Sequence, residues 1–256
     1  MGFNTYGLVY SASLFAGLLG GVKLGHLFGK RRRTSAQETD KCGTLDSVVF
    51  ALIGLLLAFS FSGAISNYGS HRDLLTKEAH HIADFHQKLD FLPEEMRTPL
   101  RASLREYANM RLAATQAEIH SSAEQEALAA SQQIQKQIWK DLVAYVKNFN
   151  NVTVSNQLLP AFSIMVSDPD AQLADAHNHV PIVVYGLIFI LATMASFLAG
   201  YGMPSLAKIP MIRVIIFSLS VSVTVYTVID LEFPRTGFFN ASPANTMLIK
   251  TIKDMS

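Results

Sequence analysis

Charged residues are missing from four long blocks of this chain. No Asp, Glu, Lys or Arg occurs in residues 1–22, 47–71, 181–207 and 214–229. A helix needs roughly 20 residues to cross about 30 Å of hydrocarbon, and each apolar block is close to that length. We therefore predict an all-α membrane protein with four transmembrane helices. Their expected bounds are about 5–28, 45–68, 181–203 and 210–230.

The chain between the second and third spans has a different character. Residues 69–180 hold ten basic and fourteen acidic residues, and apolar residues recur there at steps of three and four, which predicts amphipathic helices. We expect helices at about 71–92, 96–119, 121–149 and 156–166, with SDPD interrupting the return to the membrane. The predicted domains are two transmembrane hairpins around an inserted helical bundle, followed by a tail. Their bounds are 1–68 and 181–230 for the hairpins, 69–180 for the extramembrane bundle and 231–256 for the tail.

Basic residues next to the spans predict the orientation in a cell (inner) membrane. Two short connections carry most of them: Lys23, Lys30, Arg31, Arg32, Arg33 and Lys41 in the first, Lys208 and Arg213 in the second. Short loops rich in Lys and Arg stay in the cytoplasm. We therefore expect residues 69–180 and both termini to be non-cytoplasmic. The four spans make the lipid bilayer an expected partner of the protein.

Composition argues against several classes of function. A net charge of +1 argues against a nucleic-acid partner, and the single Cys42 excludes an internal disulfide or a cysteine zinc cluster. We find no phosphate loop, nucleophile elbow or zinc-protease motif, so we predict neither an enzyme nor a cofactor. One Glu-x-x-His unit, Glu78 to His81, lacks the second copy of a di-iron bundle, so no metal site is expected.

A glycine repeat in the first span is typical of close helix packing. Gly17, Gly21, Gly25 and Gly29 recur every four residues, and small residues at this spacing let two helix backbones approach in lipid. The partner helix is either in the same chain or in another subunit.

Two polar groupings have a predicted place in the fold. Glu78 lies on the buried stripe of the first bundle helix, and a hairpin near residue 94 would place it opposite Arg111, so we predict a buried ion pair; the alternative is a solvated Glu78 at the rim. His71, Arg72, His177, His179 and Asp230 are expected at one membrane surface. They form either a pH-sensitive polar cluster or simple headgroup anchors.

Three stretches resemble the bestrophin-like domain family of bacterial membrane proteins. The first begins with GLLLAFSFSGAISNYGSHRDLL and continues to Tyr107. The second begins with LLPAFSIMVSDPDAQLADAHNHV and continues to Met203. The third is VIDLEFPRTGFFNASP. The resemblance extends more distantly to true bestrophins, which are pentameric anion channels lined by their second span. It implies a pore neck at Leu55 and Phe59.

The sequence departs from true bestrophins in two ways. Asn67 and Tyr68 stand where an Arg-Trp pair is expected, although Arg72 matches a later Arg. True bestrophins also keep their helical domain in the cytoplasm, opposite to the side predicted from the basic loops. The resemblance nevertheless favours a homo-oligomeric, ion-permeable assembly that passes small anions. The alternative is a non-transporting sensor or scaffold that acts through its extramembrane bundle.

Overall fold

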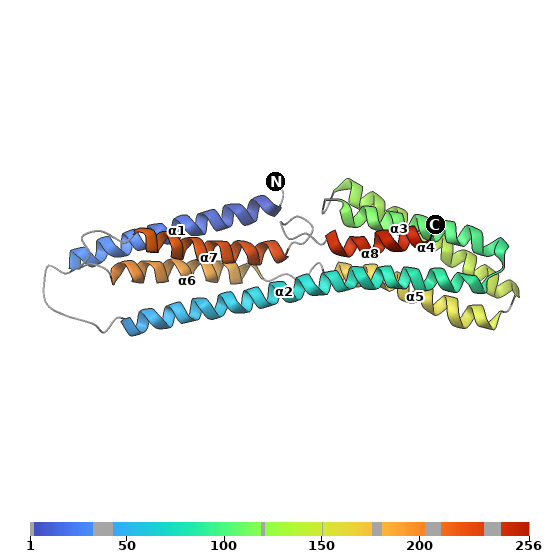
Figure 1. Cartoon of the computed structure of the whole chain (residues 1–256), viewed down its shortest axis with the longest axis horizontal. Coiled ribbons are helices and arrows are strands. Elements are labelled where there is room, and N and C mark those ends of the chain that lie inside the picture. Colours follow the sequence, from blue (N-terminus) through green and yellow to red (C-terminus); the bar gives the residue numbers. More distant parts are fainter. Residues whose placement is uncertain are drawn as a thin grey trace. The chain divides into compact units, whose positions relative to one another are not determined.

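The structure is a computed structural model of the whole chain. It describes residues 3–32, 43–118, 121–149, 151–175, 181–202, 211–232 and 242–255. Over these residues the chain is helical and contains no strand, which confirms the predicted fold class. The elements in chain order (Figure 1) are α1 (Phe3–Arg32), α2 (Gly43–Lys88), the short 3₁₀ helix η1 (Leu89–Phe91), α3 (Glu94–Gln116), α4 (Ser122–Phe149), α5 (Val152–Asp175), α6 (Ile182–Tyr201), α7 (Met211–Glu232) and α8 (Ser242–Asp254).

Four helices are long and apolar enough to cross a membrane. Their candidate spans are Thr5–Arg31, Ser47–Phe91, Val183–Tyr201 and Met211–Glu232. The second is longer than a bilayer requires, because the second span and the first helix of the bundle form one continuous helix, α2.

The chain divides into two compact units, and α2 contributes to both. The membrane unit contains residues 1–67 and 179–239, and the bundle unit contains residues 68–178 and 240–256. Each unit has its own apolar core.

In the membrane unit, α1 packs along both α6 and α7 (Figure 1). The centre of this contact is apolar, with Leu14 and Leu18 of α1 against Ile188 of α6 and Val225 of α7. The second span adds a ring contact, since Phe50 of α2 meets Phe217 of α7 edge to face at 5.7 Å between centroids.

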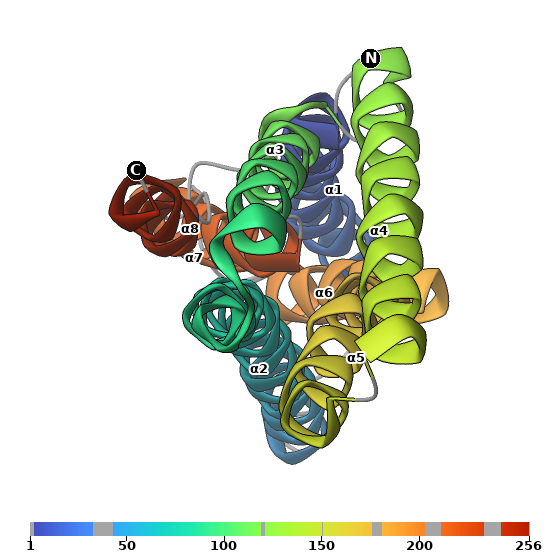
Figure 2. The same ribbon diagram turned by 90° about the vertical axis from the view of Figure 1, so that its right-hand side faces the viewer.

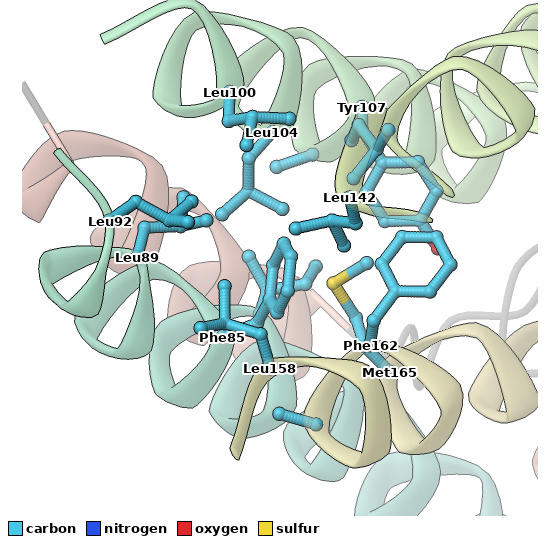
Figure 3. Packing of buried hydrophobic residues seen from close by; sticks show 14 of the residues in the cluster. Phe85, Leu89, Leu92, Leu100, Leu104, Tyr107, Leu142, Leu158, Phe162 and Met165 are labelled. Carbon is cyan, nitrogen blue, oxygen red and sulfur yellow. The ribbon is translucent and has the colours of Figure 1, made fainter. Parts of the chain in front are cut away.

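The bundle unit is held by a larger core. α3 and α4 lie side by side (Figure 2). Side chains from α3, α4, α5, η1 and the part of α2 around Phe85 meet in one core. Figure 3 shows these side chains, which include Phe85, Leu104, Tyr107, Leu142 and Phe162. The helix boundaries are marked by local signals: Ser121 accepts a hydrogen bond from the Glu124 backbone at 3.1 Å, which caps α4.

The expected helix at 156–166 is too short, and the expected break at SDPD is wrong. α5 begins at Val152, where the Asn151 side chain accepts a hydrogen bond from the Val154 backbone. It continues through both Pro160 and Pro169 to Asp175. An internal proline costs a helix about 3 kcal/mol. The buried stripe of α5, which includes Leu158 and Met165, continues past both prolines. Packing of this whole face therefore outweighs the local loss.

The predicted tail contains a further helix, α8, which was not predicted from the sequence. Leu248 of α8 is buried in the core of the bundle unit, together with side chains of α3. The Thr251 hydroxyl lies 3.5 Å from the Ala79 carbonyl oxygen of α2. The C-terminal helix is therefore part of the bundle.

Candidate functional site

Three buried polar side chains from three helices meet inside the bundle. Arg111 of α3 donates from Nε to Glu78 Oε1 of α2 at 2.5 Å, and its Nη2 lies 3.4 Å from Glu78 Oε2. Gln172 of α5 closes the network: its Oε1 accepts from Arg111 Nη2 at 2.9 Å, and its Nε2 donates to Glu78 Oε2 at 2.7 Å. The structure thus brings Glu78 and Arg111 together in the bundle interior, where Glu78 is fully buried.

A second polar contact lies one helical turn away. His81 follows Glu78 by three residues on α2, and Asp168 precedes Gln172 by four on α5, so each pair shares one face of its helix. His81 Nδ1 and Asp168 Oδ2 are 2.7 Å apart. Burial raises the pKa of the Asp168 carboxyl above its ordinary value, although the hydrogen bond and charge of His81 oppose this shift.

The electrostatics of the network favour a fixed charge at Arg111. Burial alone would lower the pKa of its guanidinium, but the Glu78 carboxylate outweighs this effect and the pKa lies above its ordinary value. A buried pair of this kind is costly to break, because the remaining charge has no water to replace its partner. The network therefore holds α2, α3 and α5 in one arrangement. The two polar residues of the Glu-x-x-His unit contact different partners: Glu78 contacts Arg111, and His81 contacts Asp168.

The candidate neck residues lie on an exposed face of the second span. Leu55 is 52% exposed and Phe59 is 67% exposed. Of the most apolar 18-residue segment of each span, only 17% is buried in α2, against 44% in α7. Such a surface on a membrane helix faces either lipid or another copy of the chain.

The glycine repeat of α1 lies against α6 of the same chain. A Cβ atom added to Gly21 would stand 2.2 Å from Ser196 Oγ, and one added to Gly25 would stand 2.0 Å from the Phe197 carbonyl oxygen. Gly17 has more room, with Phe189 Cζ at 3.4 Å. Gly29 is buried as well.

The five-residue polar cluster at the membrane surface stays a prediction. His177 and His179 lie outside the described residues. Asp230 is buried in the membrane unit, whereas His71 and Arg72 belong to the bundle unit and are partly or fully exposed.

A different polar contact at the end of α7 went unnoticed in the sequence. The Tyr185 hydroxyl of α6 donates to the Glu232 carboxylate, and the Tyr10 hydroxyl of α1 donates to the Tyr185 carbonyl oxygen at 2.5 Å. An acid buried at the end of an apolar helix needs such a donor. This rule could have pointed to Glu232 from the sequence, but it could not have identified Tyr185 as the donor.

Comparison with known proteins agrees with this architecture. The sequence model of the bestrophin-like domain matches residues 13–246, which is most of the chain. The chain belongs to the bestrophin-like domain family. This confirms the resemblance seen in the three sequence stretches, and it extends the match to α1 and α4, where those stretches do not reach.

A solved structure shows a fold similar to that of this bestrophin-like chain. It is a single-residue variant of a bacterial bestrophin homologue from Klebsiella pneumoniae, with a TM-score of 0.57 and 14% identity. The alignment covers 94% of this chain and 98% of the homologue. Comparison with curated proteins gave no match. The family and the four apolar helices together identify a membrane-embedded protein.

Proposed function

We propose that this protein forms a homo-oligomeric, ion-permeable channel in which α2 lines the path and Leu55 and Phe59 form its neck. The observation that carries the proposal is the exposure of α2, the least buried of the four candidate spans. An apolar helix that contacts its own unit so little has most of its surface available for copies of itself. Family membership supports the same assignment, since the resemblance to bestrophins implies a pore on the second span.

The exposed face of α2 changes character along its length. Leu52, Leu55, Phe59, Ser62 and Ser66 follow one another at alternating steps of three and four, and all five are exposed. Residues at this spacing lie on one stripe of a helix. Copies of α2 around an axis would therefore place an apolar ring at Phe59 and hydroxyl groups beyond it. Apolar constrictions of this kind control ion passage by excluding water.

We propose small anions as the permeant ions, on the strength of the family resemblance and of Arg72. This Arg is exposed on α2 beyond the serine positions. Asn67 does not supply the second cation that the bestrophin pattern has, so we expect weaker anion selectivity than that pattern implies.

Two measurements test the channel. The protein purified in detergent should be a symmetric oligomer by native mass spectrometry, and liposomes that contain it should pass chloride. Phe59→Ala should increase the flux because it widens the apolar ring. Phe61→Ala is the matched control: it lies two residues away on the same helix, on another face, and should leave the flux unchanged. A monomer, or liposomes as tight as empty ones, would refute the proposal.

We further propose that the bundle and both termini lie outside the cytoplasm, on the basis of the Lys and Arg residues in the two short connections. The C-terminal helix α8 supports part of this arrangement, because it packs in the same compact unit as the bundle and so must share its side of the membrane. A reporter enzyme that is active only outside the cytoplasm, fused near residue 125 or after residue 256, should be active at both places. Activity of a cytoplasmic reporter at these places would reverse the orientation.

A further inference from the structure

The bundle unit contains a pocket of about 210 Å³ that no step of the proposed ion path uses. Residues of three helices line it: Tyr107 and Arg111 from α3, Leu128, Ser131, Gln132, Gln135 and Lys136 from α4, and Val166 and Pro169 from α5. All of them belong to the same compact unit, so the pocket is a feature of the bundle alone.

The residues that line this pocket include cations and no acid, although Glu78 behind the wall is paired with one of the cations, Arg111. Arg111 and Lys136 contribute two cations, and no acidic residue is among the lining side chains. Lys136 has no ion-pair partner within the part of the chain that the structure describes. Gln132 and Gln135 add amide groups that can donate hydrogen bonds. The charge of Lys136, together with guanidinium and amide donors and no carboxylate in the wall, favours an anionic ligand.

Arg111 is held in place for such a role. Nε and Nη2 are engaged by Glu78 and Gln172, whereas Nη1 has no hydrogen-bond partner among the described residues. A guanidinium that is fixed by two neighbours loses little conformational freedom when it binds a further acceptor, so the site is preorganised.

The remaining lining residues limit the ligand. Leu128, Val166 and Pro169 form an apolar part of the wall, which a fully hydrated inorganic ion would not use. The volume is below the range of about 300–1,000 Å³ that is usual for drug-sized molecules. We propose that this pocket binds a small organic anion, a carboxylate with a short apolar body. It contacts Arg111 and Lys136 through the carboxylate and Leu128, Val166 and Pro169 through the body.

The test is a binding measurement on the full-length protein in detergent, by isothermal titration with benzoate. Benzamide, which has nearly the same shape and no charge, is the matched control ligand. Benzoate should bind saturably and benzamide at least about tenfold more weakly, because the neutral amide lacks the charge that the two cations favour. Equal binding of the two probes, or no saturable binding of benzoate, overturns the proposal.

Variants locate the binding on α4 without disturbing the buried network. Lys136→Gln should weaken benzoate binding about three- to fivefold, the effect of one partly solvated charge. Lys140→Gln, one turn further along the same exposed face, should leave benzoate binding unchanged.

Gln132→Trp, at an exposed lining position, should block the pocket, whereas Gln133→Trp beside it should not. Benzoate binding that survives both Lys136→Gln and Gln132→Trp unchanged places it elsewhere and overturns the proposal. Since the readout is binding alone, these results do not depend on ion flux.

Discussion

Gly25 and Phe197 lie so close together that any side chain at position 25 would force the two backbones apart. A Cβ atom added to Gly25 would stand 2.0 Å from the Phe197 carbonyl oxygen and 2.8 Å from the Tyr201 backbone nitrogen. The contact is reciprocal, because a Cβ added to Gly200 would stand 2.1 Å from the carbonyl oxygen of Val22. The backbones of α1 and α6 therefore touch on both sides, which is how van der Waals attraction joins helices in lipid.

Gly25→Ala should destabilise the membrane unit by about 1–3 kcal/mol, because the backbone atoms that it meets cannot move aside like the end of a side chain. Gly20→Ala on the same helix is the control. A Cβ there meets nothing within 4 Å, and alanine is the better helix former by up to about 1 kcal/mol. Thermal unfolding in detergent, followed by far-ultraviolet circular dichroism, should show a lower midpoint for Gly25→Ala only. Equal midpoints for the two variants would contradict the tight contact.

Glu78→Gln should destabilise the bundle by about 3–5 kcal/mol. The substitution keeps the shape of the side chain but leaves the Arg111 guanidinium buried without its anion. Asp84→Asn on the same helix removes half of an exposed pair, since Asp84 Oδ2 lies 2.7 Å from Lys88 Nζ at the surface. That change should cost under about 1 kcal/mol. Chemical unfolding of both variants measures the difference. A Glu78→Gln variant as stable as Asp84→Asn would mean that the buried pair contributes nothing.

Leu248→Ala tests whether the C-terminal helix is a structural part of the bundle. Leu248 is 2% exposed in the bundle core, and truncating a buried leucine to alanine costs about 2–5 kcal/mol. Its neighbour Met247 is 37% exposed, so Met247→Ala should change stability by under about 1 kcal/mol. The same unfolding measurement compares the two. If Leu248→Ala leaves the stability of the bundle unchanged, α8 is only loosely attached.

The fold was predictable where the signal is local and repeated. Charge-free blocks reveal the four spans, because burying a charge in hydrocarbon is expensive wherever it occurs. The steps of three and four reveal α3 and α4 for a similar reason. The prediction failed at α5, where Pro169 was interpreted as a break. Tertiary packing of the buried face decides that case, and packing is not visible from a local rule. The helix in the tail was missed because it is short and depends on the bundle for its stability.

The candidate site was predictable only in part, for the same physical reason. Glu78 stands out because a carboxylate occupies a position of the apolar stripe, and the turn near Pro93 sets the register that places Arg111 opposite. Gln172 gives no such signal, since it comes from α5, 94 residues further along the chain. Asp168 was hidden in the segment interpreted as a break. Partners that long-range packing supplies have no spacing rule by which a sequence could reveal them.

The buried Asp168 should make the stability of the bundle depend on pH in a defined direction. Its pKa is raised by burial above the ordinary value of 3.8, so the folded protein binds the proton more tightly than the unfolded chain. The resulting stabilisation is fully present below pH 3.8 and is lost as the pH rises through the raised pKa, with a slope of at most about 1.4 kcal/mol per pH unit. Asp168→Asn keeps the shape of the side chain but cannot titrate. The stability of the wild type relative to Asp168→Asn, measured by urea unfolding across acidic to neutral pH, should therefore fall as the pH rises. A difference that stays constant, or that grows with pH, would show that His81 and Arg111 stabilise the ionised carboxylate at least as much as burial penalises it.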